Sequence, residues 1–595
     1  EDMIKNADFL VDIGPGGGVH GGEVVASGSI DDLMNSPKSI TGDYLANRKY
    51  IPVPLSRRKG NGKFLSISGC TVNNLKNISV MVQNWSSYQL DIFNEIENGN
   101  SNIVVNAVAG SGKTTTIVEA CKRLNKPSEK VQFLAFNKSI ATELKTKLSG
   151  YACVNTLHSF GYSILTKLFN TSRYHKVFTN NNKYFKYLQK NIFDMSSCIN
   201  REMDNITIFN ACKTVKKIFD LARVNLIEYE DINSLERLCD VYNILPKYDE
   251  IHVANELLKN AYTMPSDLVI DFTDMIVLPL AYRKHIPTFD YVFIDECQDL
   301  NTAQRTLMLC AAKGGRFIAV GDRNQAINGF CGADCTSFDS ICNLPNTIEL
   351  PLSVNYRCGT NILKLAQEIV PQIQPCNNAI SGDIEHYTTL SRSLFHKGDM
   401  VLCRKTAPLV SLCFKLLENG ITAVIKGSDI ADAMKELIKR ANVSSMQELK
   451  TWIQSEKNSM AKEIADYLKV SVDVAKKTKK YVILSDRLNC IENMCVNSVS
   501  NVSDIKSYID RMFDEKNVKN AVVLSTAHKS KGLESDRVIL MIPNQFPLTF
   551  KNKKQKPWEL EQEMNLKYVA ITRAKKELIM LDMNENEIKD AKITD

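Results

Sequence analysis

The sequence predicts an α/β fold in which buried parallel strands present functional residues at their carboxyl ends. Three apolar runs support this prediction, namely Ile103 to Val105, Tyr291 to Ile294 and Phe317 to Val320. Continuous apolar runs of this length are typical of strands buried on both faces of a parallel sheet. Because ligands of such sheets bind at the carboxyl edge, we expect the residues after the three runs to meet at one site.

The first run leads into a glycine-rich loop that ends in Gly-Lys-Thr. It satisfies the pattern G-x-x-x-x-G-K-[ST] except at the first position, where Ala107 stands for glycine. Small residues let backbone N–H groups approach a phosphate closely, and the following helix adds its positive N-terminal end. Lys113 would supply a charge to the β- and γ-phosphates, and the Thr114 hydroxyl is the expected Mg²⁺ ligand. The residues expected to hold the nucleotide are Ala109, Gly110, Ser111, Gly112, Lys113, Thr114 and Thr115.

The other two runs supply the acidic and polar groups that hydrolysis requires. Asp295 would hold Mg²⁺ and Glu296 would polarise the attacking water, since phosphoryl transfer depends mainly on positioning and charge neutralisation. The third run ends in Gly321 and Asp322, and Gln325 follows where it would sense a γ-phosphate. We therefore expect a nucleoside triphosphatase.

Eight short segments between residues 89 and 574 follow one another in a recognisable order: Gln89, Ala109 to Thr114, Thr156 to Phe160, Asp295 to Asp299, Gly321 to Gln325, Asn355 to Arg357, His528 to Glu534 and Tyr568 to Ala574. Their identity and order resemble those of superfamily 1 UvrD/Rep-like DNA helicases. The resemblance implies two RecA-like parallel-sheet motor domains with helical insertions, and an ATP hydrolase coupled to DNA unwinding.

The resemblance also implies roles for residues that no local pattern would assign. Gln89 would read the adenine edge, Tyr356 would stack on the base and Glu534 would contact the ribose. Arg357 and Arg573 would reach the γ-phosphate from the second motor domain as arginine fingers. ATP and Mg²⁺ are the cofactors that these roles require.

Aromatic residues beside hydroxyls and lysines predict single-stranded DNA binding, because stacking tolerates any base while cations follow the phosphates. The expected DNA contacts are Phe136, Asn137, Lys138, Thr156, His158, Phe160, Phe330 and His528. The alternative for Phe136 and Phe160 is a place in the core. Near Phe330 the chain departs from the family, which commonly has tyrosine in place of Asn328 and arginine in place of Cys331.

Composition limits the function less sharply. The formal net charge of +7 over 595 residues is too small to prove a polyanion partner. The 17 cysteines include no C-x-x-C pair, which argues against a zinc or iron–sulfur site. No run approaches the length of a membrane span and the start is no signal peptide, so we expect a cytoplasmic protein, bacterial or phage-encoded and associated with the nucleoid.

The first 80 residues differ from the rest, since they hold eleven of the 27 glycines. Gly16 to Gly21 satisfies G-x-G-x-x-G, but Gly22 to Gly28 reads as a strand and not as the helix that a dinucleotide site requires. The segments Asp12 to Val25, Thr41 to Leu45, and Asn73 to Ile78 resemble an internal piece of UvrA, the damage-recognition ATPase of the excinuclease ABC system. Neither ATPase motif of that family is present, so we expect a fragment that packs poorly and is dispensable.

These observations divide the chain into three parts. We expect a UvrA-like fragment over residues 1–80, a first motor domain over 84–345 with a helical insertion at 167–265, and a second over 346–595 with an insertion at 430–515. The function expected is an ATP-dependent helicase or translocase on single-stranded DNA and at single-strand/duplex junctions, moving 3′→5′. The alternatives are a translocase that does not separate strands, and a fragment of an excision-repair damage-recognition protein.

Overall fold

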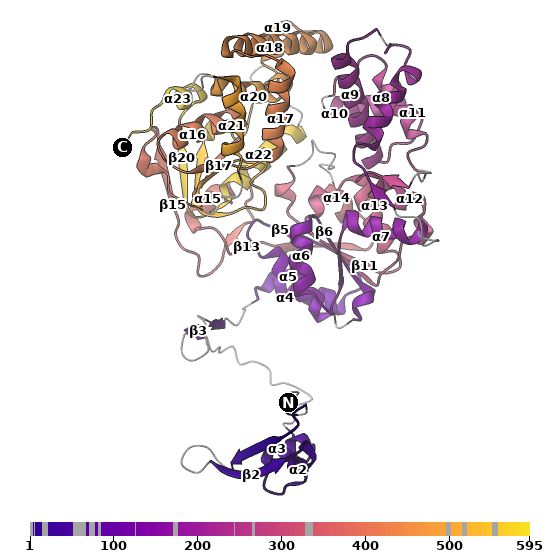
Figure 1. Ribbon diagram of the computed structural model, residues 1–595, viewed down its shortest axis with the longest axis vertical. Coiled ribbons are helices and arrows are strands. Elements are labelled where there is room, and N and C mark those ends of the chain that lie inside the picture. Colours follow the sequence, from indigo (N-terminus) through magenta and orange to yellow (C-terminus); the bar gives the residue numbers. More distant parts are fainter. Residues whose placement is uncertain are drawn as a thin grey trace. The chain divides into compact units, whose positions relative to one another are not determined.

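The structure of the protein is a computed structural model. It describes residues 4, 6–14, 22–50, 67–70, 78–80, 85–124, 126–169, 177–200, 202–242, 244–263, 268–327, 337–495, 501–514, 520–549 and 557–594. The chain divides into two compact units, Glu1–Asn84 and Trp85–Asp595, which are considered separately below. Figure 1 labels many of their helices and strands.

The first unit is built around a short antiparallel hairpin. Strand β1 (Leu10–Gly14) pairs with β2 (Glu23–Gly28), which confirms the strand predicted there, and helices α2 (Ile30–Asn35) and α3 (Ile40–Leu45) follow. The Asp12 carboxylate accepts a hydrogen bond from Ser39 Oγ at 2.6 Å and so ties β1 to the start of α3. A second short pair joins β3 (Ile67–Cys70) to β4 (Ile78–Val80).

The second unit contains two six-stranded sheets whose neighbouring strands pair in parallel. The first sheet has the order β12-β5-β11-β10-β6-β7. Its strands are β5 (Asn102–Ala107), β6 (Val131–Ala135), β7 (Cys153–Thr156), β10 (Tyr291–Ile294), β11 (Arg316–Gly321) and β12 (Thr347–Leu352). The three predicted apolar runs lie in β5, β10 and β11, which are neighbours in this sheet.

Helices cover both faces of this sheet because its strands are apolar on both sides. Val105 on β5 packs into a core with α4 (Ser87–Asn98), α5 (Lys113–Arg123) and α6 (Lys138–Lys147), whereas its neighbour Val104 faces the opposite core. That core includes α7 (Leu157–Phe169), α12 (Asp274–Ala281), α13 (Thr302–Ala311) and α14 (Ser337–Cys342). Figure 1 shows the two sets of helices on opposite sides of the strands.

A helical insertion separates α7 from α12. It consists of α8 (Lys183–Met195), α9 (Asn205–Val224), α10 (Ile232–Val241) and α11 (Glu250–Leu258), which share one hydrophobic core. The short strands β8 (Phe178–Thr179) and β9 (Val269–Ile270) pair in parallel at its base and bring its two ends together.

The second sheet has the order β15-β20-β19-β16-β18-β17. Its strands are β15 (Asp383–Tyr387), β16 (Met400–Cys403), β17 (Ala423–Ile425), β18 (Val522–Thr526), β19 (Ser535–Met541) and β20 (Ala574–Leu581). One face packs on α15 (Thr360–Gln367) and α22 (Pro557–Ile571). The other packs on α16 (Thr406–Glu418) and on α23 (Glu585–Asp590).

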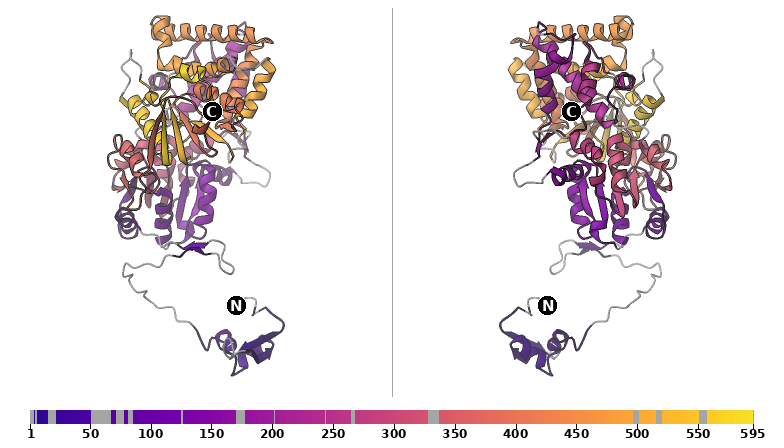
Figure 2. Two further views of the ribbon diagram at one scale, coloured as in Figure 1. Left: turned by 90° about the vertical axis from the view of Figure 1, so that its left-hand side faces the viewer. Right: turned by 90° about the vertical axis from the view of Figure 1, so that its right-hand side faces the viewer.

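The second insertion is also helical. It consists of α17 (Ser428–Ala441), α18 (Met446–Leu468), α19 (Val472–Lys476), α20 (Lys479–Met494) and α21 (Val502–Met512). Figure 2 shows the long helix α18 running across the top of the second unit in both views.

The predicted fold class is confirmed, since the chain holds two parallel α/β sheets with helical insertions. One boundary differs from our expectation. β12 pairs with β5 in the first sheet, so that sheet extends to Leu352, past residue 345. Among the described residues, no helix is long and apolar enough to cross a membrane.

Candidate active site

The phosphate loop lies between β5 and α5, and its two glycines adopt the conformation that the motif requires. Gly110 has φ 66° and Gly112 has φ 77°, a left-handed region that favours glycine. A Cβ added at Gly110 would lie 2.7 Å from the Arg357 side chain, so this position also needs glycine for space. The buried Ser111 Oγ has no hydrogen-bond partner in the described part of the protein. These residues form a cradle with an unsatisfied hydroxyl, which fits a bound triphosphate.

The acidic strand faces this loop. Lys113 Nζ lies 3.6 Å from Glu296 Oε1. Burial acts to lower the pKa of Lys113, but the carboxylates of Glu296 and Asp322 outweigh it and hold that pKa above its usual value. The lysine is therefore a permanent cation, as a ligand for phosphate must be.

The two adjacent carboxylates differ in their protonation. Burial and the neighbouring Glu296 raise the pKa of Asp295 to about 7. Burial opposes ionisation of Glu296 as well, yet the charges of Lys113 and Lys531 lower the pKa of Glu296 to about 2. Glu296 is thus an ionised base, while at Asp295 burial and the charge of Glu296 outweigh the attraction of Lys113 and Lys531. This difference suits a metal ligand beside a group that orients water, with Thr114 half-buried at the start of α5 as the second predicted ligand.

Gln325 and Asp322 form a polar pair at the end of β11. Asp322 and Gln325 are buried, and Gln325 Nε2 donates to Asp322 Oδ2 at 2.6 Å. The Asp322 backbone N–H donates to Gln298 Oε1 at 3.1 Å, and Gln298 Nε2 donates to Glu296 Oε2 at 2.5 Å. A chain of hydrogen bonds therefore connects Gln325 to the residue expected to polarise water.

The second sheet contributes arginines to the same region. Arg573 is 2% exposed, and its guanidinium donates to the carbonyls of Val569 at 2.9 Å and Leu533 at 3.1 Å. Burial, with the charge of Arg357 beside it, lowers the pKa of Arg573 to about 10. The positive charge of Arg573 also acts to lower the pKa of Lys113 in the first motor domain. Both predicted arginine fingers thus lie close to the phosphate loop.

Lys531 connects the two halves of the site, although no role was predicted for it. It extends from the turn after β18, and its Nζ donates to Gln325 O at 2.7 Å and to the Asp299 carboxylate. Half-buried His528 lies in the same turn. The sequence hinted at a role for Lys531 only through its place in the segment His528 to Glu534. Its contact with Gln325 joins residues more than 200 positions apart, which no local pattern reveals.

Two of the residues expected to bind the base and the sugar, Gln89 and Glu534, are engaged in other contacts, whereas the third, Tyr356, presents an exposed ring. Gln89 is buried, its Oε1 accepts the Ser86 N–H at 2.9 Å and its Nε2 donates to Thr116 Oγ1 at 2.8 Å. Tyr356 is 47% exposed and its ring is available to a base. Glu534 pairs with Arg357.

The predicted DNA contacts divide into surface and core residues. Thr156 and His158 are half-buried at the start of α7, and Asn137 is exposed as the N-cap of α6, with its side chain accepting the Ile140 N–H. Phe160 is 2% exposed within the core that covers the first sheet, so its assignment as a DNA contact is wrong.

The remaining predicted DNA contacts are Phe136, Lys138 and Phe330. Phe136 is half-buried and Lys138 is exposed at the start of α6. Phe330 lies outside the described residues.

Phe272 is a candidate that the sequence analysis did not assign. Its ring is 54% exposed and lies edge-on to His158, with centroids 5.9 Å apart and planes at 90°. It lies between β9 and α12. The structure identifies Phe272 as a candidate because its exposed ring lies beside His158, and the sequence alone does not show this neighbour.

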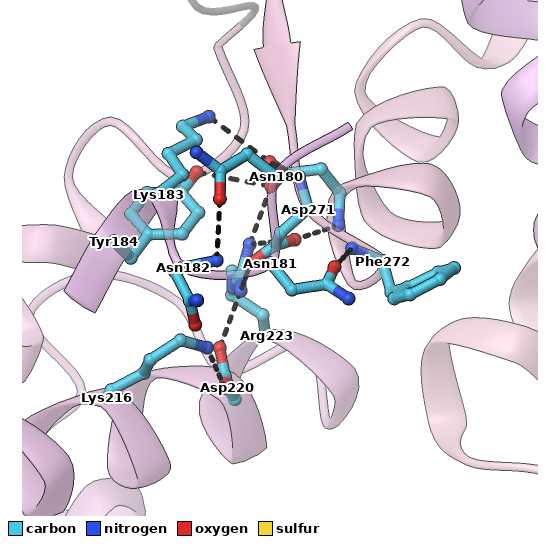
Figure 3. Close-up of polar contacts among 11 residues, drawn as sticks. Asn180, Asn181, Asn182, Lys183, Tyr184, Lys216, Asp220, Arg223, Asp271 and Phe272 are labelled. Atoms are coloured by element: carbon cyan, nitrogen blue, oxygen red, sulfur yellow. Dashed lines mark hydrogen bonds and ion pairs between the residues drawn. The ribbon is translucent and has the colours of Figure 1, made fainter. Parts of the chain in front are cut away.

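A buried ionic network holds Phe272 against the first helical insertion, as Figure 3 shows. Arg223 on α9 is completely buried and donates to Asp271 Oδ2 at 2.8 Å and to Asp274 Oδ1 at 2.6 Å. The Phe272 backbone N–H donates to Asn181 Oδ1 at 3.1 Å. These contacts therefore fasten the segment before α12 to the first helical insertion.

A glycine cradle, an acidic strand and arginines from the second motor domain are the features of a P-loop nucleotide-binding protein. Family comparison gives the same class in more detail. Residues 90–344 match the UvrD/REP helicase N-terminal domain, and residues 385–585 match the UvrD-like helicase C-terminal domain. The chain belongs to the UvrD/REP helicase family, and these domains support an ATP-dependent DNA helicase.

The N-terminal part is similar to UvrABC system protein A. The identity is 44% over 119 residues in Halalkalibacterium halodurans, covering 20% of this chain and 11% of the relative. It is 45% over 135 residues in Streptococcus mutans, covering 22% and 13%, and 43% over 117 residues in Thermus thermophilus, covering 20% and 11%. The chain thus spans about a tenth of the length of these relatives. The matches are longer than the 80 residues that we assigned to the fragment.

An arterivirus nonstructural protein 10 helicase aligns over 83% of this chain and 61% of its own, at 11% identity and a TM-score of 0.29. That score is too low to support an argument.

Proposed function

We propose that the protein is an ATP-driven motor that moves on single-stranded DNA and separates strands at single-strand/duplex junctions. The observation that carries this proposal is that the second motor domain places Arg573 near Lys113 of the phosphate loop and Lys531 on Gln325 of the first domain. Chemistry between two domains changes how they pack, and such a change can move a bound polymer.

The chain's own residues would divide the work as follows. Lys113 and the loop N–H groups would bind the phosphates, while Asp295 and Thr114 would hold Mg²⁺, which would neutralise charge on the β- and γ-phosphates. Glu296, already ionised, orients the attacking water. Arg357 and Arg573 neutralise the charge that develops on the γ-phosphate, an effect worth roughly 10³ to 10⁵ in rate for other NTPases.

DNA would lie over the exposed residues of the first motor domain. Phe272 and His158 offer adjoining rings, and Lys138 offers a cation at the start of α6. Rings of this kind bind any base by stacking, so we expect little sequence preference. By resemblance to the family we propose movement in the 3′→5′ direction, in the cytoplasm at the nucleoid, in repair, replication or recombination.

One experiment tests the motor and its fuel site together. ATP turnover is measured with and without single-stranded DNA for the full chain and for Lys113→Ala. We expect a large rise with DNA that the variant loses. Turnover that persists in Lys113→Ala would reject the site.

Polarity and strand separation need a second measurement on duplexes with only a 3′ or only a 5′ tail. We expect unwinding from the 3′ tail. DNA-stimulated ATP turnover without unwinding of either substrate would favour the alternative, a translocase that does not separate strands, which the short second insertion motivates.

The other alternative, a damage-recognition protein, rests on the first unit alone. A chain beginning at Trp85 tests it, because that residue starts the second compact unit. We expect its ATP turnover to stay within about twofold of the full chain, a difference below about 0.5 kcal/mol in barrier. Lesion-specific binding by the first unit alone would support the alternative.

A further inference from the structure

The phosphate loop is held from outside by residues that belong to the second motor domain and to the segment leading into it. The Ala109 N–H donates to the Tyr568 hydroxyl at 2.8 Å, and the Ala109 carbonyl accepts from Asn355 Nδ2 at 2.7 Å. The next carbonyl, that of Gly110, accepts from the Tyr356 N–H at 2.9 Å. Three backbone polar groups of the adjacent loop residues Ala109 and Gly110 are thus bonded across the junction of the two domains.

These contacts are fully enclosed. Tyr568 and Asn355 are both 0% exposed, and Ala109 packs into the core formed by α15, α22 and the second sheet. Buried hydrogen bonds of this kind cost free energy when one partner is removed, because water cannot replace it. The loop backbone therefore has a defined orientation only with these partners in place.

Tyr568 also reaches the far side of the site. Its hydroxyl, which accepts from Ala109, lies 3.5 Å from Asp322 Oδ2, the oxygen that accepts from Gln325 Nε2. Burial, strengthened by Asp322, keeps the pKa of Tyr568 well above its usual value, so the phenol remains protonated. One hydroxyl thus joins the phosphate loop to the polar pair at the end of β11.

We propose that Tyr568 and Asn355 are positioning residues that complete the phosphate cradle when the second motor domain is seated on the first. We call the hydrogen bonds from Tyr568 and Asn355 to Ala109 the clamp. Arg357 and Arg573 lie in the same short segments as Asn355 and Tyr568, so the clamp also sets where the arginines meet the phosphates. Seating of the domain and assembly of the cradle become one event. This inference rests on the ATP turnover proposed above.

Tyr568→Phe tests the clamp because it removes the hydroxyl and keeps the ring that packs in the core. One lost buried hydrogen bond corresponds to about a tenfold change in rate. We expect kcat for DNA-stimulated ATP turnover to fall about tenfold with KM changed less than about twofold, since the clamp acts on the assembled site. The melting temperature should stay within about 2 °C of the wild type.

Asn355→Asp tests the other side of the loop. It keeps Oδ1, which accepts the Arg357 and Cys358 N–H groups at 2.8 Å, and replaces the Nδ2 donor to Ala109. We expect a similar loss of kcat, and a double variant with Tyr568→Phe that loses less than the product of the two, because both act on one residue of the loop.

Tyr387→Phe is the matched control. It removes the hydroxyl that donates to Glu385 Oε2 at 2.9 Å, on an edge strand of the same domain. The clamp is refuted if Tyr568→Phe behaves like this control, or if its defect appears only in KM or in the melting temperature. Lys113→Ala separates this failure from failure of the proposed function, because only the latter predicts turnover that survives Lys113→Ala.

Discussion

Arg357 Nε lies 2.7 Å from Glu534 Oε2, so the residue expected to reach the γ-phosphate is paired with the residue expected to contact the ribose. Glu534 also lies 2.5 Å from Lys575 Nζ. Burial acts against ionisation, but Lys575 and Arg357 lower the pKa of Glu534, which is therefore charged at neutral pH. For Arg357 to reach the γ-phosphate and Glu534 to reach the ribose, the ion pair between them must break.

Replacing Arg357 tests its expected role at the γ-phosphate. In Arg357→Ala we expect kcat for ATP turnover to fall by roughly 10³, with a much smaller change in nucleotide affinity, because a finger stabilises charge that develops in the transition state. Arg357→Lys should restore little, since an ammonium lacks the planar fork. Arg511→Ala, at an exposed arginine of α21, is the control. Equal losses in the two alanine variants would exclude a role at the phosphate.

Glu250 gives the protein a dependence of stability on pH. Burial raises the pKa of Glu250 to about 8, although its Oε2 accepts the Lys247 N–H at 2.7 Å. Its unfolded pKa is near 4.5, so between pH 4.5 and about 8 the folded state holds a proton that the unfolded state has lost. Stability from this group therefore declines as the pH rises through that window and levels off above it.

We expect Glu250→Gln to melt at a higher temperature than the wild type at about pH 8, and the difference to shrink towards about pH 5. The amide keeps the acceptor for Lys247 and cannot ionise. Thermal unfolding at both pH values measures the difference. Glu256→Gln, at an exposed position of the same helix, should show no such trend. A constant gap between wild type and Glu250→Gln would contradict the assigned ionisation.

The sequence predicted the first sheet because its central strands are continuous apolar runs that end in functional residues, whereas the second sheet followed from the family resemblance. It ended the first domain too early because β12 is an edge strand whose residues are half-buried or exposed up to the buried Leu352. It placed Phe160 on the DNA although Leu157, Phe160 and Ile164 recur at helical spacing and face the core.

The clamp on Ala109 was beyond reach of the sequence for a different reason. Ala109 and Tyr568 are separated by 459 positions, and no local pattern pairs a backbone N–H with one of 20 tyrosines. Motif order placed Tyr568 near the nucleotide, but only the packing of the two sheets selects its partner. The same holds for Lys531 and Gln325.

Arg223 should be essential for the first insertion to stay attached. Arg223→Met removes the arginine that pairs with the buried Asp271 and Asp274 and leaves Lys183 as the cation beside Asp274, and removing one partner of a buried pair costs about 3–5 kcal/mol. We expect a lower melting temperature and faster proteolysis within residues 177–263. Arg237→Met, exposed on α10, is the control. An unchanged cleavage rate in Arg223→Met would show that the insertion is held by other contacts.

Phe272 should bind a base of single-stranded DNA. Stacking on an aromatic ring is worth about 1–3 kcal/mol per base, so Phe272→Ala should raise the DNA concentration that half-saturates ATP turnover by about fivefold or more. Phe272→Trp should retain binding because it keeps a flat ring beside His158. Tyr187→Ala removes a 49% exposed ring on α8 and serves as the control. Because Arg223 holds the segment that carries Phe272, Arg223→Met should weaken DNA binding as well. Normal DNA affinity in Phe272→Ala would place the strand on another part of the surface.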